Sequence, residues 1–295
     1  MNIKASAPGK LMLFGEHAVV YGYPCIVTTV SSRIYVEVEK SNEFKVDAPQ
    51  VKDLKFVLKT VRLFCEKYKV DNKILIKTKS DFSSKLGFGS SSAVTVATIK
   101  ALSLFYKIEI SKKEVFDMGY KVIREIQKIG SGFDIASAIY GKTIYYVSGG
   151  QIIETLSVKD LSLVIGYSGI KADTASIVKN LESRIHNSES EYKKIFSKIG
   201  KIVEEAKISL VNSDWKRTGE LMNQNHKLLQ ELGVSTEKLD NMCFSAVSAG
   251  AYGAKLSGAG GGDCMIALTP KNKIKNVESA IINAGGEIIN AKINV

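Results

Sequence analysis

The spacing of apolar and polar residues along the chain predicts a mixed α+β protein. Short runs rich in β-branched residues, with partial alternation of apolar and polar positions, predict strands. Longer segments with apolar residues every three or four positions predict helices. The predicted strands are residues 3–7, 11–14, 26–30, 34–39, 74–78, 143–147, 161–167 and 264–268. The predicted helices are residues 53–69, 91–106, 112–127 and 236–249, and a charged, largely helical region covers residues 176–232.

A turn signal at Gly149-Gly150 separates a predicted strand from a change of pattern and predicts a domain boundary. We therefore expect an N-terminal domain over residues 1–150 and a C-terminal domain over residues 151–295. The length of 295 residues is enough for two moderate domains, each with its own core.

The net charge and the apolar runs limit the classes of partner. The formal net charge is +11, but the lysines are spread along the chain and no recognised nucleic-acid module is present, so we expect no nucleic-acid partner. No apolar run approaches the roughly 20 residues that cross a bilayer, and the N-terminus lacks a signal-peptide pattern. We therefore expect a cytoplasmic protein without a membrane partner. The scattered cysteines, without C-x-x-C spacing, predict reduced thiols.

A glycine-rich segment over residues 85–93 precedes the predicted helix 91–106 and is typical of a phosphate-binding loop. Gly87 and Gly89 allow the backbone to turn tightly, and the free amides of a helix N-terminus attract anions. The three hydroxyls that could face phosphate or a metal ion belong to Ser90, Ser91 and Ser92. The segment is neither a Walker A loop nor a Rossmann fingerprint, and taken alone it is equally well explained as a loop with a serine N-cap.

Two further segments carry candidate chemistry. Residues 255–263 hold four glycines before the predicted strand 264–268, and such a run costs about 1 kcal/mol for each glycine relative to alanine. Close approach of a ligand to the backbone is the usual compensation. Near the N-terminus, Lys10, Glu16 and His17 surround a predicted tight turn. A cation, a carboxylate and an imidazole together indicate a functional site.

In this order and spacing, the three segments resemble the signature motifs of the GHMP small-molecule kinases. The run Gly15-Glu-His-Ala-Val-Val-Tyr-Gly-Tyr-Pro24 and the closing segment 223–262 are most similar to the mevalonate kinase branch. The run Lys128-Ile-Gly-Ser-Gly-Phe-Asp134 departs from that branch and is closer to phosphomevalonate kinases. The resemblance implies an N-terminal domain like domain 2 of ribosomal protein S5, a ferredoxin-like C-terminal domain, and an active site between them.

The resemblance also implies an activity and a set of roles. The expected reaction is ATP-dependent phosphorylation of the 5-hydroxyl of mevalonate, a step of isoprenoid biosynthesis, with ATP and Mg²⁺ as cofactors. Asp134 is the implied catalytic base and Lys10 its partner. The implied metal ligands are Ser91 and Glu125. The implied nucleotide-binding residues are Lys85, Gly87, Gly89, Ser90, Ser91 and Ser92, and the implied acceptor-binding residues are Glu16, His17, Thr174, Gly258, Ala259 and Gly260.

Each role has a simpler structural alternative, and the function has two. Asp134 fits a helix N-cap, Glu125 an exposed helical glutamate, and Thr174 a turn hydroxyl. A phosphomevalonate kinase would need extra cations, for which Lys85, Lys128 or Lys171 are available, but residues 16–24 hold no arginine or lysine, which favours mevalonate. The other alternative is a metabolite-binding protein without catalysis, against which Lys10, Ser91 and Asp134 argue together. The oligomeric state stays open, with a homodimer among the alternatives.

Overall fold

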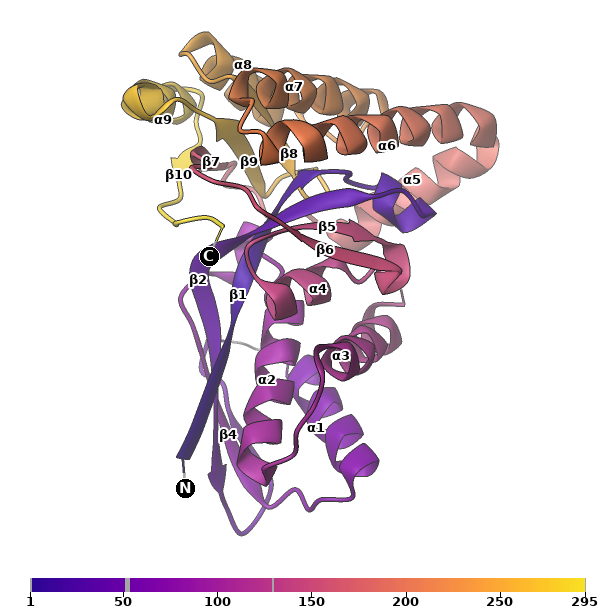
Figure 1. Ribbon diagram of the computed structural model, residues 1–295, viewed down its shortest axis with the longest axis vertical. Coiled ribbons are helices and arrows are strands. Elements are labelled where there is room, and N and C mark those ends of the chain that lie inside the picture. The colour runs from indigo at the N-terminus through magenta and orange to yellow at the C-terminus, as the bar shows by residue number, and fades with distance from the viewer. Residues whose placement is uncertain (1, 51–53, 129, 295) are drawn as a thin grey trace.

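The computed structural model of the chain describes residues 2–50, 54–128 and 130–294 and places them around two sheets (Figure 1). The first sheet has six described strands in the order β3-β4-β2-β5-β6, with β1 paired to β2. The second has four described strands in the order β10-β7-β9-β8. These sheets and their helices form the predicted two-domain α+β architecture.

The first sheet is built around two long strands. Its strands are β1 (Asn2–Phe14), β2 (Cys25–Lys40), β3 (Lys45–Asp47), β4 (Ile74–Ser80), β5 (Thr143–Val147) and β6 (Ile152–Leu156). β1 pairs with β2 along nearly its whole length, while β4 and β5 pair with different halves of β2. Register shifts between Pro8 and Lys10 and between Met12 and Phe14 interrupt the ladder, which is why the sequence predicts two short strands where the structure has one.

Four helices pack on this sheet in two layers (Figure 1). They are α1 (Lys55–Tyr68), α2 (Ser90–Tyr106), α3 (Lys112–Gln127) and α4 (Phe133–Tyr140). α2 and α4 pack directly on β1 and β2, and α1 and α3 pack on α2. Because α2 has neighbours on several sides, it is apolar over most of its surface. The start of α3 is fixed by a capping box in which Ser111 and Glu114 bond each other's backbone amides.

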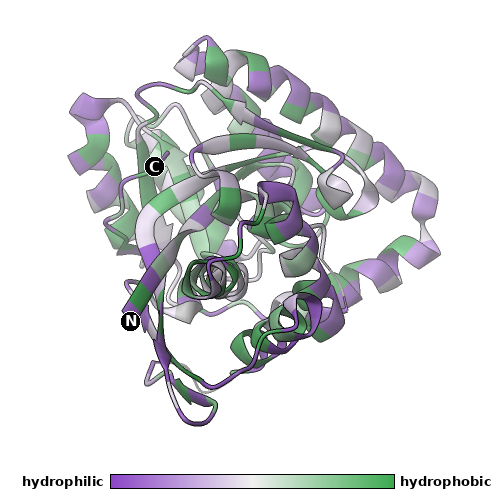
Figure 2. Ribbon diagram, turned by 60° about the horizontal axis from the view of Figure 1, so that its bottom comes forward, coloured by the Kyte–Doolittle hydropathy of each residue, from purple (hydrophilic) through white to green (hydrophobic). Residues whose placement is uncertain are grey.

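The second sheet supports the remaining helices. Its strands are β7 (Leu163–Tyr167), β8 (Gly253–Ser257), β9 (Cys264–Leu268) and β10 (Glu287–Ile288). The helices are α5 (Thr174–Asn187), α6 (Glu189–Val211), α7 (Trp215–Glu231), α8 (Glu237–Ser248) and α9 (Ile274–Asn283). α7 and α8 pack on β8, α9 packs on β7 and β10, and α6 packs on α7. Hydrophobic and hydrophilic residues alternate along the peripheral helices, as expected when one face of a helix meets the core (Figure 2).

The expected elements agree with these bounds, except that the predicted strands 26–30 and 34–39 form the single strand β2 and that a few short or late elements were not predicted. The region 176–232 divides into α5, α6 and α7, and position 53 of the predicted first helix lies outside the described residues. The sequence did not indicate β3, β6, β8, α9 or β10. β6 pairs with β5, so the first sheet extends beyond residue 150. All four cysteines are free thiols, and no helix among the described residues has the length and apolar character that a bilayer span requires.

The two halves meet where the end of β1 packs against β8. Residues 11–14 of β1 are buried, as is every residue of β8. The hydroxyl of Ser257 accepts a hydrogen bond from the Met12 amide at 2.9 Å and donates one to the Met12 carbonyl at 3.0 Å. This contact places the turn after β1 beside the glycine-rich loop after β8.

The close packing of α7 on β8 predicts that replacing a glycine of the helix by alanine destabilises the protein. A Cβ atom on Gly219 would lie 2.4 Å from the carbonyl carbon and oxygen of Tyr252. Helix propensity alone favours alanine over glycine by about 1 kcal/mol. We expect the clash to dominate, so that Gly219→Ala lowers the free energy of unfolding by roughly 1–3 kcal/mol in urea titrations.

Gly119→Ala in α3 is the matched control for this substitution. Its Cβ would meet only the side chain of Ile135, at 3.1 Å, and a side chain can adjust where a backbone cannot. The control should lose clearly less stability than Gly219→Ala. A Gly219→Ala protein as stable as the wild type would contradict the close approach of α7 to β8.

Candidate active site

Lys10 and Asp134 form an ion pair at the centre of the candidate site. The Lys10 Nζ lies 3.2 Å from Asp134 Oδ1, with the lysine largely buried and the aspartate side chain 34% exposed. Lys10 belongs to β1, and its amide donates to the Phe88 carbonyl at 3.0 Å, which ties the strand to the loop before α2. Asp134 lies in the first turn of α4. Oδ1 is buried and has no hydrogen bond among the described residues, so Lys10 is the charged group that it faces, and the exposed part of the carboxylate is left for a ligand.

The glycine-rich loop before α2 closes against this pair. Gly89 has a φ of 72°, and a Cβ there would lie 3.1 Å from Asp134 Oδ1 and 3.2 Å from Lys10 Cε. Only glycine therefore lets the loop come this close with this backbone conformation. Gly89 is also the N-cap of α2 and offers no side chain to its first amides. Those amides and the helix dipole can therefore attract an anion next to the ion pair.

The other residues of this loop divide into exposed and packed positions. Ser90 and Ser91 are half-buried at the start of α2, while Ser92 is buried and Lys85 is exposed. At Gly87, an added Cβ would lie 2.6 Å from the carboxylate oxygen Oδ2 of Asp263. Gly87 is thus required for contact between two glycine-rich segments.

Asp263 is a buried carboxylate that the sequence reasoning did not single out. Its Oδ1 accepts from the Ala172 amide at 2.9 Å, and burial raises its pKa while Lys10 and Lys171 oppose that rise. Its φ of 54° is a conformation that aspartate tolerates better than most residues. Its position at the end of the glycine-rich segment 255–263 is the sequence feature that could have indicated a role at the site.

His17 is held by the second glycine-rich loop. Its Nε2 lies 2.9 Å from the Ala259 carbonyl oxygen, which can only accept, so Nε2 carries the proton. Burial lowers the pKa of His17 to about 4, and the positive charge of Arg184 contributes to the shift. The ring is therefore neutral at pH 7, and its Nδ1 is a hydrogen-bond acceptor.

Glu16 pairs with Lys255, a cation that the sequence did not indicate, and not with Lys10. Both side chains are fully buried, and burial raises the pKa of Glu16 and lowers that of Lys255. Lys255 lies in the middle of β8, between apolar neighbours. A lysine in a short strand is usually interpreted as a solvent-facing residue, so no local pattern indicated this pair.

The three predicted loop positions have different surroundings. Gly258 has a φ of 108°, and a Cβ there would meet nothing within 4 Å. Ala259 contacts His17 as described above. A Cβ on Gly260 would lie 2.0 Å from the Val234 carbonyl oxygen, so that glycine serves the packing of the loop on the segment after α7. Gly258 and Ala259 are the positions nearest to open space and to His17.

Thr174 and Glu125 lie away from the contacts just described. Thr174 is exposed at the first position of α5, after the N-cap Asp173. Glu125 forms ion pairs with Lys59 and Lys121, and Lys59 is the main cause of its lowered pKa. No ion pair or hydrogen bond among the described residues joins Glu125 to Ser91. The part of the chain that the structure describes also holds no group of three His, Cys, Asp or Glu residues arranged for a metal ion.

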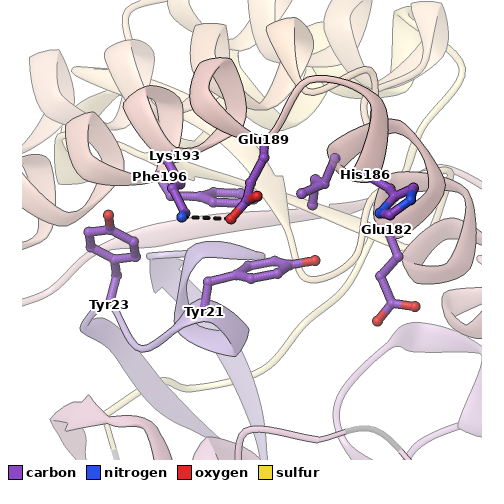
Figure 3. Close-up of a pocket in the computed structure, with 8 residues that line it drawn as sticks. Tyr21, Tyr23, Glu182, His186, Glu189, Lys193 and Phe196 are labelled. Atoms are coloured by element: carbon purple, nitrogen blue, oxygen red, sulfur yellow. Dashed lines mark ion pairs between the residues drawn. The ribbon is translucent and has the colours of Figure 1, made fainter.

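A cavity of about 390 Å³ lies outside this cluster, between the segment after His17 and the helices α5 and α6 (Figure 3). The rings of Tyr21 and Phe196 stack with centroids 4.5 Å apart, and Glu189 pairs with Lys193 at 2.6 Å. The cavity is lined by Tyr21, Tyr23, Glu182, Ile185, His186, Glu189, Lys193 and Phe196. None of the predicted catalytic or nucleotide-binding residues lines it.

Comparisons with known proteins agree with the arrangement of the motifs. Residues 55–142 match the GHMP kinases N terminal domain and residues 206–287 match the GHMP kinases C terminal domain. A mevalonate kinase of Pyrococcus abyssi is 37% identical over 96% of this chain and 93% of its own length. The crystal structure of the Methanococcus jannaschii mevalonate kinase is 27% identical, with a TM-score of 0.85 over 99% of this chain and 98% of that one. That of the L. major mevalonate kinase in complex with R-mevalonate is 25% identical, with a TM-score of 0.84 over 99% and 95%.

A fold of this kind and a carboxylate set beside a phosphate-type loop define a small-molecule kinase. The chain belongs to the GHMP kinases, which confirms the prediction from its motifs, and its fold is the two-domain fold of that family. Within the family, the relatives just described are mevalonate kinases.

The two buried histidines predict that acid destabilises the protein. Burial lowers the pKa of His17 and of His226 to about 4, whereas an unfolded histidine titrates near 6.5. The unfolded state therefore binds more protons than the folded state as the pH falls below about 6.5, and stability is lost from there towards pH 4. We predict that between about pH 7 and pH 5 the wild type loses roughly 2 kcal/mol more of its unfolding free energy than His17→Asn does.

Urea unfolding at both pH values measures this difference. Asparagine tolerates the φ of 61° at position 17, so the substitution keeps the backbone of the turn. His186→Asn, at an exposed position, is the control and should follow the wild type. Equal pH dependence in His17→Asn and wild type would show that His17 is not buried as a neutral ring.

Proposed function

We propose that this chain transfers the γ-phosphoryl group of ATP to the 5-hydroxyl of mevalonate. The observation that carries the proposal is the closure of the Gly89 loop onto the Lys10–Asp134 ion pair, 3.2 Å between its charged atoms. This closure puts an anion-binding helix start next to a carboxylate that is partly open to a substrate. The names of the relatives support mevalonate as the acceptor and do not favour its 5-phosphate or a non-catalytic role.

The ion pair meets two requirements of phosphoryl transfer at the reacting oxygen. The attacking hydroxyl must be oriented, and charge that develops around the transferred group must be balanced. The partly exposed Asp134 carboxylate accepts the hydroxyl proton, and Lys10, 3.2 Å from that carboxylate, offsets the negative charge on the transferred group. Because Lys10 is also bonded to the loop through Phe88, the cation and the nucleotide loop keep a fixed separation.

The nucleotide binds, in this proposal, at the start of α2. The uncapped amides there bind phosphate oxygens, with the hydroxyls of Ser90 and Ser91 beside them and Lys85 at the exposed edge. Mg²⁺ prefers hard oxygen ligands, and the half-buried Ser91 hydroxyl fits this requirement. Held there by Ser91, the ion would help to neutralise the charge of the phosphates. Glu125 would reach such an ion only after releasing Lys59, so we place the ion on Ser91 and the phosphates.

The acceptor binds between His17, the open position at Gly258 and the side of α5 that carries Arg184. The neutral His17 ring donates through Nε2 to Ala259, so its Nδ1 accepts from a hydroxyl and does not bind a carboxylate. The half-buried Arg184 of α5 is the cation on that side, and it suits the carboxylate of mevalonate. Thr174 begins the same helix. Both substrates are small molecules. We place the enzyme in the cytoplasm, where it acts alone or as a homodimer.

Removal of the carboxylate charge tests the catalytic assignment. Asp134→Asn should lower kcat by roughly a thousandfold, the usual size of a lost general base. Binding of ATP, measured by calorimetry, should change little because a carboxylate makes no attractive contact with phosphate oxygens. Asp214→Asn, the N-cap of α7, is the control for loss of a helix-capping aspartate and should keep its turnover. Turnover near the wild-type value in Asp134→Asn would remove Asp134 from the mechanism.

The choice of acceptor is tested separately, by ADP release with mevalonate and with 5-phosphomevalonate. A phosphate adds about two negative charges at neutral pH, and a site built for it needs converging cations, each worth roughly ten- to a hundredfold in affinity. Arg184 is a single cation of this kind. We predict that kcat/KM is at least about a hundredfold higher for mevalonate than for its 5-phosphate. The reverse preference would overturn the acceptor assignment and leave the catalytic pair standing.

A further inference from the structure

A fully buried ion pair joins the two sheets next to the proposed acceptor site. Glu16 follows β1 of the first sheet, and Lys255 lies in β8 of the second. Neither side chain has exposed surface. The Lys255 Nζ also donates to the Leu256 carbonyl at 2.6 Å, and the described residues offer no hydrogen-bond donor to Glu16 Oε2. The pair is therefore sealed from solvent and has no room to act on a substrate directly.

Each residue of the ion pair is close in sequence to a segment that we place at the acceptor. Glu16 directly precedes His17, and Lys255 lies three positions before Gly258. The Gly258 amide helps to lower the pKa of Glu16 against the effect of burial, so its positive end lies near the carboxylate. The bond from His17 to the Ala259 carbonyl links the same two segments again. Any shift of Lys255 relative to Glu16 would thus move His17 and Gly258 apart.

The turn is also supported from a third element. Asn225 of α7 is fully buried, and its Oδ1 accepts from the Gly15 amide at 3.4 Å. This contact holds the residue just before Glu16. The turn is therefore held from α7 as well as through the contact of Glu16 with Lys255.

A buried ion pair is a poor source of stability, and this points to another role. Taking two charges out of water is unfavourable, and apolar residues of similar size often do as well in a core. What an ion pair adds is direction, since the charged groups attract strongly only in one arrangement. That property suits a contact between two sheets whose relative position must be set closely.

We propose that Lys255 is a positioning residue that acts through Glu16 to hold the His17 turn against the Gly258 loop. The consequence is a fixed acceptor site, with no contact between Lys255 or Glu16 and the substrate. The kinetic part of this inference depends on the proposed function. The part that concerns His17 does not, and it can be measured without any substrate.

The test compares Lys255→Met with the double substitution Glu16→Gln and Lys255→Met. The single change leaves a buried carboxylate without its partner and should lower the thermal unfolding temperature, while the double change removes both charges and should recover most of that loss. A purely structural pair would recover its kinetics together with its stability. We expect that the double variant instead keeps a KM for mevalonate raised at least about tenfold, with kcat and the KM for ATP within about twofold of wild type.

A spectroscopic measurement gives the second readout. The titration of His17, followed by NMR and assigned with His17→Asn, should move from a pKa of about 4 towards that of a free histidine when the double variant loosens the turn. Lys207→Met is the matched control because it removes a half-exposed ion pair with Glu154, which joins β6 of the first sheet to α6. It should change neither the KM for mevalonate nor the His17 titration.

The outcomes separate the two hypotheses. A double variant with the wild-type KM for mevalonate and an unmoved His17 titration would overturn the positioning role. A wild-type protein that does not phosphorylate mevalonate would overturn the proposed function, and the NMR titration would still decide whether Lys255 positions His17. If the single variant fails to fold, the double variant answers both questions.

Discussion

The contact between the end of β1 and β8 is the constraint on which the site depends. It is made by the two hydrogen bonds between Ser257 and Met12 and by the buried pair of Glu16 and Lys255. β1 also carries Lys10 a few residues earlier, so the same strand reaches both the Lys10–Asp134 ion pair and the inter-sheet contact. One strand therefore sets the positions of the loop and the turn where we propose that the phosphate donor and the acceptor bind.

Glycine appears at this site for two separate physical reasons. Gly89 and Gly87 are needed because protein atoms, those of Lys10, Asp134 and Asp263, come too close for a side chain. Gly258 instead adjoins open space, where a ligand has room. A glycine-rich motif in a sequence thus combines packing within the protein with access for a substrate, and only the surroundings of each glycine distinguish the two.

The sequence was sufficient for the parts of the site whose residues act within short motifs. The Gly89 loop at the start of α2, the turn at Glu16 and His17, and Asp134 at the start of α4 were all predicted because each motif is local. Lys255, Asp263 and Arg184 were missed because their roles come from packing between segments far apart in the chain. The same holds for β3, β6 and β10, since a short strand depends on its partner more than on its own residues.

The weak anchoring of α5 has a consequence for how substrates exchange. Among its described residues only Leu181 is buried, whereas α6 next to it buries nine. Local opening of a helix with so little buried surface requires much less free energy than separating the two sheets. Thr174 and Arg184 would move with α5, while Lys10 and the Gly89 loop would stay in place. Local opening of α5 would then let a phosphorylated product leave, while a nucleotide at the Gly89 loop stays bound.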